Sequence, residues 1–430
     1  MSCAKLLENL TRGAYDEKLR TLYALDGREE SLEKAKKRAV QTVEKYRELY
    51  GEAEKPALFS GPGRTEIGGN HTDHQQGHVL CGSVDLDMLS CAAPNGTETI
   101  RICSEGYPPF EVDLGRLEPV SGEEGTSVAL TRGVAAGIAA LGHAVGGFDA
   151  YVTSNVLSGS GLSSSAAYEV LMGNIMSHFF CSGALDPITI AKIGQVAENK
   201  FFGKPCGLMD QMGSSVGGAV AIDFEHPTDP KVRAIPYRFA QSGHALCIID
   251  TASSHDDLTD EYAAIPREMG KVAAQFGREH LRQVGEADFR AAIPELRKTC
   301  GDRAVLRALH FYSDDRLAQE EAGALEEGNF EQFLTLIAAS GNSSVLRLQN
   351  IWPAGATVSQ AVALSLAAAQ DLLEGEGAVR VHGGGFAGTI QAFVPNGRLE
   401  RFKSGMEAIL GPGRCHVLHI RPIGGCVVAE

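Results

Sequence analysis

The sequence predicts an α+β protein with two domains, and three observations lead to this prediction. Segments typical of strands and of helices follow one another irregularly, without the repeated strand–helix–strand order of a parallel α/β fold. The chain has 430 residues, which is more than a single hydrophobic core usually organises. A charge-rich turn at residues 225–231 separates the two halves. We therefore expect a helical extension over residues 1–55, a first domain over 56–235 and a second domain over 236–430.

Composition and charge narrow the class of protein. Apolar residues make up 43% of the chain and charged residues 22%, which is typical of a globular protein. The net charge of −15 argues against nucleic acid or an anionic membrane as a partner, because both select clustered Lys and Arg. The N-terminus lacks signal-peptide features, no apolar run is long enough to span a bilayer, and the ten cysteines contain no CxxC pair. We expect a cytoplasmic monomer with reduced thiols.

The first 55 residues favour helices. Ser31 is suited to cap a helix that ends before Gly51. The expected buried stripe of this helix has apolar residues at helical spacing: Leu32, Ala35, Ala39, Val43 and Tyr46. Residues 57–59 then indicate a short strand, and Gly61-Pro62-Gly63 indicates a turn after it.

The rest of the first domain mixes strands and helices. Strands are expected near residues 88–93, 99–103, 110–114 and 149–156, and helices over 127–141 and 164–180. Asp186 and Pro187 provide an N-cap and a first-turn proline for a helix that runs to about Phe202.

The second domain continues in the same irregular order. Its expected strands lie near residues 245–249, 389–394, 416–420 and 426–429, and its expected helices near 260–276, 303–325 and 330–339. A turn is expected at Pro395-Asn396-Gly397. The absence of a regular alternation favours α+β over α/β.

A glycine- and serine-rich loop at residues 159–167 lies between an expected strand and an expected helix. Its glycines allow several backbone N–H groups to face one anion, and the start of the helix adds a positive dipole end. The loop lacks the Gly-Lys-Ser/Thr of a Walker A motif. It is a candidate phosphate site, with a plain turn as the alternative.

Two further clusters stand out. Residues 63–75 are dense in polar side chains, and a carboxylate with a histidine can match the donors and acceptors of sugar hydroxyls. An exposed polar loop is the alternative. His71 and His74 around Asp73 also suggest a metal site, but no helix pattern supports one. Three adjacent glycines at residues 383–385 indicate either a ligand contact or a tight backbone crossing.

These motifs resemble those of galactokinases, in the GHMP kinase superfamily. Gly63-Arg64, His71-Thr72-Asp73, the loop at 159–166, Gly207-Leu208-Met209-Asp210-Gln211 and Gly383-Gly384-Gly385-Phe386 follow the order of that family. The resemblance covers the chain from about residue 56 to the C-terminus. It implies the two-domain GHMP kinase fold, with the active site in the cleft between the domains.

The resemblance also implies an ATP-dependent sugar 1-kinase that uses Mg²⁺. Asp210 occupies the place of the catalytic carboxylate and Arg64 that of its cationic partner, while Ser165 and Glu198 occupy the places of the Mg²⁺ ligands. The implied sugar-binding residues are Asn70, His71, Asp73, Asp210 and Tyr262. The implied ATP-binding residues are Gly159, Ser160, Gly161, Leu162, Ser163, Ser164, Ser165 and Ala166, with Gly384 and Gly385 from the second domain.

General chemistry agrees with these roles. Phosphoryl transfer needs alignment and charge neutralisation more than covalent help. Asp210 could accept the proton of a sugar hydroxyl, and Arg64 would hold Asp210 ionised and oriented.

The chain departs from the family motif at the sugar positions. The usual Gly-Glu-His-Thr-Asp-Tyr reads Gly69-Asn70-His71-Thr72-Asp73-His74, and the usual Arg-Val-Asn reads Arg64-Thr65-Glu66. In the family the Glu faces the 6-hydroxyl of the sugar, so its loss would let the pocket tolerate a C6 carboxylate. We expect galactose as the substrate, with galacturonate as the alternative. A sensor that binds galactose and ATP without catalysis is disfavoured, because the phosphate loop, Arg64 and Asp210 are all in place.

Overall fold

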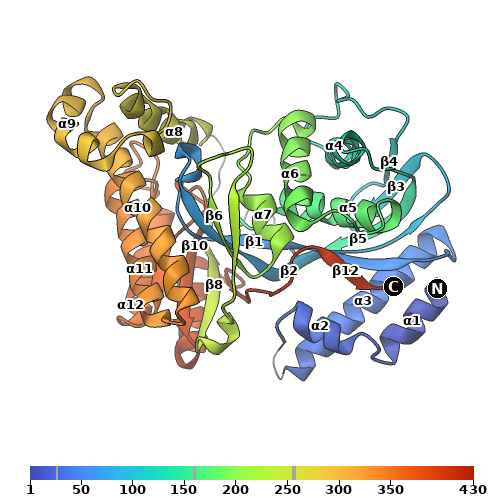
Figure 1. Ribbon diagram of the computed structural model, residues 1–430. Helices are drawn as coiled ribbons and strands as arrows, with labels where there is room; N and C mark the ends of the chain where they lie inside the picture. The colour runs from blue at the N-terminus through green and yellow to red at the C-terminus, as the bar shows by residue number, and fades with distance from the viewer. Residues whose placement is uncertain (26–27, 158–160, 254–257) are drawn as a thin grey trace.

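The chain forms two lobes, each with its own β-sheet (Figure 1). A computed structural model describes residues 1–25, 28–157, 161–253 and 258–430.

The first sheet contains most of the N-terminal strands. In the described part of the chain it has eight strands, in the order β12-β1-β2-β5-β3-β4, with β6 paired to β2 and β7 to β6. The strands are β1 (Ala57–Gly68), β2 (His78–Pro94), β3 (Thr99–Ser104), β4 (Phe110–Asp113), β5 (Phe148–Ser154), β6 (Ala219–Asp223), β7 (Lys231–Ile235) and β12 (Cys426–Ala429). The C-terminal strand β12 pairs antiparallel with β1, so the end of the chain returns to this sheet.

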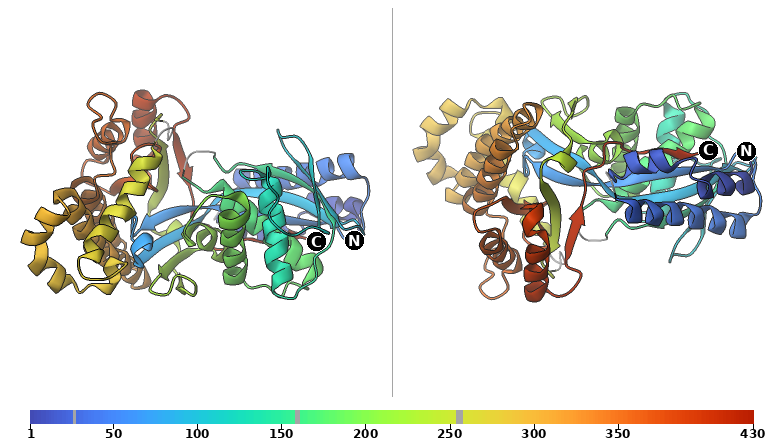
Figure 2. Two further views of the ribbon diagram at one scale, coloured as in Figure 1. Left: turned by 90° about the horizontal axis from the view of Figure 1, so that it is seen from above. Right: turned by 90° about the horizontal axis from the view of Figure 1, so that it is seen from below.

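Helices cover both faces of the first sheet, because successive residues of a strand point to opposite sides. Phe59 packs against α4 and α5, whereas its neighbour Leu58 packs against the N-terminal helices. One layer consists of α1 (Cys3–Thr11), α2 (Asp16–Leu22) and α3 (Glu29–Tyr50), seen from below in Figure 2. The other layer consists of α4 (Ser127–Ala140), α5 (Ser164–Phe180), α6 (Pro187–Ala197), η2 (Glu198–Phe202) and α7 (Met209–Val216). The predicted extension is thus a packed layer of the first lobe.

The second sheet has the order β11-β8-β10-β9 among the described residues. Its strands are β8 (His244–Asp250), β9 (Ala378–His382), β10 (Thr389–Pro395) and β11 (Cys415–Leu418). The helices around it are α8 (Thr259–Ala274), α9 (Glu286–Thr299), α10 (Asp302–Glu326), α11 (Phe330–Ser343), α12 (Ala361–Leu373) and α13 (Leu399–Leu410). We propose that the chain passes between domains after Ile235, where β7 ends.

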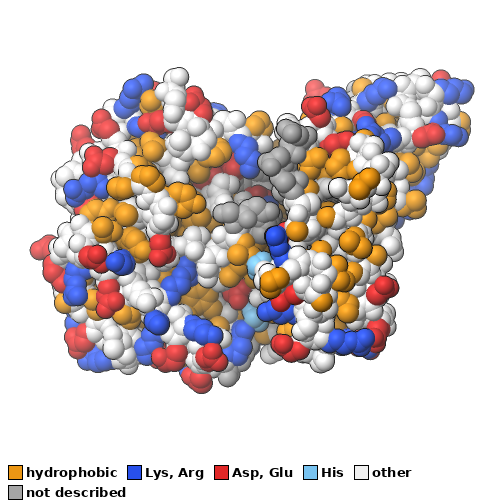
Figure 3. All heavy atoms as spheres, turned by 180° about the vertical axis from the view of Figure 1, so that it is seen from behind, with side chains coloured by type: hydrophobic (Ala, Val, Ile, Leu, Met, Phe, Trp, Pro, Cys, Tyr) orange, Lys and Arg blue, Asp and Glu red, His pale blue; other side chains and the backbone are white. Residues whose placement is uncertain are grey.

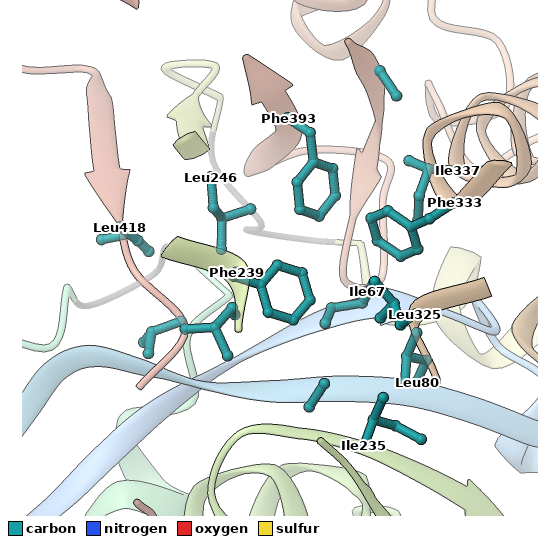
Figure 4. Packing of buried hydrophobic residues seen from close by; sticks show 14 of the residues in the cluster. Ile67, Leu80, Ile235, Phe239, Leu246, Leu325, Phe333, Ile337, Phe393 and Leu418 are labelled. Atoms are coloured by element: carbon teal, nitrogen blue, oxygen red, sulfur yellow. The ribbon is translucent and has the colours of Figure 1, made fainter. Parts of the chain in front are cut away.

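The two sheets share a hydrophobic core (Figure 4). Ile67 and Leu80 from β1 and β2 meet Phe393 of β10 and Phe333 of α11 in this core. The rings of Phe333 and Phe393 pack edge to face with centroids 5.1 Å apart. Ile67, near the end of β1, packs in the same cluster as these rings, and this close packing holds the end of β1 against the second sheet.

The predicted turn at Gly61-Pro62-Gly63 is wrong, because β1 continues through these residues to Gly68. The glycines serve close packing instead. A Cβ on Gly61 would lie 2.3 Å from the carbonyl oxygen of Ala167 in α5. The proline is tolerated because the pairing with β2 shifts register between Pro62 and Arg64.

The predicted cap at Ser31 is also wrong, because α3 begins at Glu29. Two glutamates, Glu29 and Glu30, occupy its first turn, where negative charge complements the helix dipole. The predicted stripe is otherwise confirmed, since Leu32, Ala39, Val43 and Tyr46 are buried.

The surface mixes charges of both signs, with acidic and basic side chains interspersed over the face in Figure 3. All ten cysteines are free thiols. Among the helices in the described ranges, none has the length and apolar character needed to cross a membrane.

Candidate active site

A partly buried ion pair joins β1 to the start of α7, with the Arg64 side chain 8% exposed and the Asp210 side chain 27% exposed. Arg64 Nε and Nη2 donate to Asp210 Oδ1 at 2.8 and 2.6 Å. Leu208 is the N-cap residue of α7, so the Asp210 carboxylate is directed to Arg64 and does not cap the helix. Burial alone would raise the pKa of Asp210, but the charge and hydrogen bonds of Arg64 outweigh it, and the pKa lies below its ordinary value. The pair is therefore an ionised carboxylate beside a cation.

The glycine–serine loop lies against this pair. Arg64 Nη1 donates to the carbonyl oxygen of Gly161, and the Arg64 backbone N–H donates to the carbonyl oxygen of Leu162 at 3.0 Å. Ser163 has a left-handed backbone with φ of 54° and is the N-cap residue of α5, yet its side chain does not cap the helix. Ser163 is one of the groups that lower the pKa of Asp210. The first N–H groups of α5 therefore remain suited to an anion. Gly159 and Ser160 lie outside the described residues.

Ser165 and Glu198 lie beside the same helix start. Ser165 Oγ donates to Glu198 Oε1 at 2.9 Å, and Lys204 Nζ lies 3.4 Å from the same oxygen. The Glu198 side chain is buried. No group of three or more His, Cys, Asp or Glu side chains able to hold a metal occurs in the described part of the chain. A hydroxyl and one carboxylate nevertheless fit Mg²⁺, which takes few protein oxygens when phosphates supply others.

A second carboxyl group lies behind Glu198. Gln211 Nε2 donates to Glu169 Oε2 at 2.9 Å and to Glu198 Oε2 at 2.8 Å. Glu169 and Gln211 are fully buried. Burial, reinforced by the charge of Glu198, raises the pKa of Glu169 well above its ordinary value.

Asn70 is held on every side by the protein. Its Nδ2 donates to Glu66 Oε1 at 2.8 Å and to the carbonyl oxygen of Gly383 at 2.7 Å, while its Oδ1 accepts from Asn350 Nδ2 at 2.8 Å. Its backbone N–H donates to Asp314 Oδ2 at 2.7 Å. Both donor hydrogens of the amide are used, so Asn70 could donate to a sugar only if one of these bonds is exchanged.

His71 and Asp73 follow on the same loop. His71 has a left-handed backbone with φ of 60°, and its Nε2 donates to the carbonyl oxygen of Gly384 at 3.0 Å. Burial, with the nearby His74, lowers the pKa of His71 to about 4, so the ring is neutral and keeps Nδ1 as an acceptor. A Cβ on Gly207 would lie 2.7 Å from Asp73 Oδ2, so this carboxylate lies beside the segment that leads to Asp210.

Two of the three glycines connect the lobes, because Asn70 Nδ2 and His71 Nε2 donate to the carbonyl oxygens of Gly383 and Gly384. Tyr262 Oη donates to the carbonyl oxygen of Gly385 at 2.9 Å, and a Cβ on Gly384 would lie 2.4 Å from the Tyr262 ring. The loop around Gly161 approaches the same region, since a Cβ there would lie 3.1 Å from His382 Nδ1. The structure therefore brings the polar loop, the glycine–serine loop, the start of α7 and the glycine turn together.

Sequence reasoning missed several polar residues behind the site. Glu66 accepts from Arg380 Nη2 at 3.1 Å, and His382 Nε2 lies 3.0 Å from Thr65 Oγ1. Burial raises the pKa of Glu66 to about 7, although Arg380 opposes the shift. Three of these residues lie in segments that the sequence had singled out, namely Thr65 and Glu66 in the polar cluster and Gln211 in the motif with Asp210. Arg380 and His382 come from β9, which has no motif of its own.

Two protein-family models match segments of this chain that contain these motifs. The family model described as GHMP kinases N terminal domain matches residues 129–218. The model described as galactokinase galactose-binding signature matches residues 44–94, so the likeness begins inside α3, earlier than the residue 56 that we expected. The galactokinase of Streptomyces coelicolor is 30% identical over 353 residues, which cover 82% of this chain and 87% of that protein.

Solved structures share the fold. The Lactococcus lactis galactokinase complexed with galactose matches with a TM-score of 0.75 at 21% identity, over 90% of this chain and 98% of that chain. The Methanococcus jannaschii mevalonate kinase matches with a TM-score of 0.59 at 15% identity, over 84% of this chain and 98% of that chain. These likenesses confirm the predicted α+β fold.

Proposed function

The chain belongs to the galactokinase family, and we propose that it transfers the γ-phosphoryl group of ATP to galactose, giving galactose 1-phosphate and ADP. The observation that carries this proposal is the ion pair of Arg64 with Asp210, which lies at the start of α5 beside the phosphate-loop residues. A general base next to an anion site is the arrangement that transfer to a hydroxyl requires.

The phosphate groups of ATP are assigned to the N-terminal turn of α5. Unpaired N–H groups and the helix dipole there stabilise anionic oxygens. Ser165 and Glu198 would hold Mg²⁺, which when bound neutralises charge on the phosphates. We assign Gly384 and Gly385 to the opposite wall, because their turn is fixed by Tyr262 and Asn350.

Asp210 is assigned to accept the proton of the attacking hydroxyl. Both Arg64 bonds end on Oδ1, so Oδ2 is the oxygen that we assign to the proton. Arg64 keeps the carboxylate ionised before the step, and its charge also offsets negative charge that develops as the phosphoryl group moves.

The sugar is assigned to the region between Asp210, His71, Asp73 and Tyr262, with Asn70 as part of the wall. Asp73 supplies a carboxylate acceptor, and neutral His71 supplies Nδ1. Galacturonate is the second candidate, since Asn70 replaces the usual carboxylate at this wall. The Glu66 carboxyl lies directly behind Asn70 and is partly neutral near pH 7, so it repels a C6 carboxylate less than an ionised group would.

An acceptor panel tests the proposal. ADP release from Mg·ATP is measured with galactose, galacturonate, glucose, mevalonate and no acceptor. We expect turnover with galactose well above all other acceptors. Preference for galacturonate would move the function to a uronate kinase, and tight galactose binding without turnover would indicate a sensor.

A further inference from the structure

Gln211 is the residue next to the proposed base, and it faces a different part of the site. Consecutive residues of a helix point about 100° apart. Asp210 turns to Arg64 on β1, whereas Gln211 turns to Glu169 on α5 and Glu198 at the start of η2. One helical turn therefore contacts both the proposed base and the proposed metal carboxylate.

The Gln211 amide fixes the orientation of the Glu198 carboxylate. Its Nε2 lies 2.8 Å from Glu198 Oε2, which leaves Oε1 next to Ser165 Oγ at 2.9 Å. Nε2 is itself anchored by Glu169 Oε2 at 2.9 Å. Both bonds use the two hydrogens of the amide, so Gln211 has no freedom to leave Glu198 without breaking its anchor.

Close helix packing makes this arrangement possible. A Cβ on Gly194 would lie 2.9 Å from Glu169 Oε2 and 3.1 Å from Gln211 Cγ, so α6 approaches only because residue 194 is glycine. Glu198 follows Gly194 by four residues and lies on the same side of the helix. Glu169 Oε1 and Gln211 Oε1 are buried without a hydrogen-bond partner among the described residues. A buried polar group left unsatisfied is costly, which is typical of a functional position.

We propose that Gln211, anchored by Glu169, is the positioning residue that presents Glu198 Oε1 to the metal ion of the nucleotide complex. The inference rests on the proposed function, in which Glu198 binds Mg²⁺. It adds a coupling between proton acceptance by Asp210 and metal binding by Glu198, since α7 carries Asp210 and, through Gln211, sets the position of Glu198.

Binding of Mn²⁺ as a probe for Mg²⁺ tests this assignment. Electron paramagnetic resonance measures the Kd of Mn²⁺ for the full-length protein with ADP. Gln211→Met keeps the length of the side chain but removes the amide, and we expect it to raise this Kd about tenfold. Galactose affinity without nucleotide should stay unchanged. Gln195→Met is the matched control, because among the described residues the Gln195 side chain donates to the Cys206 carbonyl oxygen at 3.3 Å and to neither Glu169 nor Glu198.

A double-mutant cycle identifies the route of the effect. Glu198→Gln should raise the Mn²⁺ Kd at least as much as Gln211→Met, and the double variant should bind Mn²⁺ no more weakly than Glu198→Gln alone. If Gln211→Met does not fold, Glu169→Met replaces it, with a smaller increase in Kd expected.

Three results would overturn the inference. The first is an unchanged Mn²⁺ Kd in a folded Gln211→Met protein, and the second is full additivity in the double variant. The third is an unchanged Kd in Glu198→Gln, which would remove Glu198 as a ligand and the inference with it. Galactose turnover by the unmodified protein would still report separately on the proposed function.

Discussion

The phosphate side and the sugar side of the site differ in where their residues come from. On the phosphate side, Arg64, Ser163, Ser165 and Asp210 all belong to the first sheet and the helices on it. On the sugar side, Asn70 is bonded to Gly383, 313 residues later, and to Asn350, 280 residues later. The residues assigned to phosphoryl transfer thus lie in one lobe, and the second lobe adds only the wall assigned to Gly384 and Gly385, whereas the sugar side depends on how the lobes meet.

This difference separates the residues assigned to phosphoryl transfer from the residues assigned to sugar selection. A site built within one lobe keeps its geometry when the other lobe changes, so the phosphoryl-transfer residues can serve different acceptors. The sugar loop is shaped by groups from both lobes, and a few changes there can alter which sugar fits. The departures at Asn70 and His74 fall on this loop, and the departure at Glu66 lies near the end of β1, just before it.

The largest expected effect is on the phosphate side. Asp210→Asn keeps the shape of the side chain but removes the base, so kcat should fall about 10³-fold with little change in galactose or ATP affinity. Single-turnover rates and calorimetry measure the two quantities. Asp186→Asn, at the N-cap of α6, is the control and should be nearly neutral because both residues cap helices well. A fall in galactose affinity equal to the fall in kcat would contradict the role of Asp210.

Removing Arg64 should change the pH dependence of the rate. Arg64→Met leaves burial as the dominant influence on Asp210, so its pKa should rise from below to above its ordinary value. A base is lost as pH falls through its pKa, so activity should disappear at a higher pH than in the unmodified protein. We expect kcat about 10²-fold lower at neutral pH. An acid limb of the pH–rate profile at the same pH in both proteins would break this account.

The three adjacent glycines should respond in a definite order. Gly385→Ala should lower the free energy of unfolding most. Gly385 has a φ of 80°, and a Cβ on it would lie 2.2 Å from the Asn350 carbonyl oxygen. Gly384→Ala should cost less, since the clash is with the Tyr262 ring, which can move. A Cβ on Gly383 would meet open space, so Gly383→Ala should lower the free energy of unfolding by about 1 kcal/mol through the φ of 66° alone. Urea unfolding measures the free energies, and equal losses at all three positions would be inconsistent with the packing.

The smallest expected effect is on the free energy of unfolding, and it concerns two neighbouring residues, Glu66 at the end of β1 and Asn70 on the loop that follows. The family motif has Asn and Glu where this chain has Glu66 and Asn70, and the two side chains bond at 2.8 Å. Asn70→Glu alone would place two carboxyl groups together, while Glu66→Asn with Asn70→Glu restores one donor and one acceptor. We expect the double variant to recover about 1 kcal/mol of unfolding free energy relative to Asn70→Glu. Strict additivity in the double-mutant cycle would argue against a direct pair.

The sequence allowed prediction of the parts that short segments encode. The helix over residues 164–180 was predicted to the residue, because its apolar run follows a clear glycine–serine boundary. The turn at Gly61–Gly63 was wrong because local propensity cannot register the approach of α5. Helices α9, α12 and α13 were not predicted.

The candidate site likewise has a part that the sequence could predict and a part that it could not. The meeting of Arg64 with Asp210 could be inferred from motifs, but its geometry could not. Asn350 donates to Asn70, and Arg380 donates to Glu66. The sequence has no pattern that links the partners in either pair, so only the packing of the two lobes reveals these bonds. The role of Gln211 required the positions of three helices.

The most direct test of the central claim is the ³¹P NMR spectrum of the products formed from Mg·ATP and galactose. The account predicts ADP and one new phosphate ester whose phosphorus couples to the anomeric proton of the sugar, and about 10³-fold slower formation of that ester with Asp210→Asn. Release of inorganic phosphate alone, or an ester at another hydroxyl, would contradict the assignment of Asp210 to the anomeric hydroxyl of galactose.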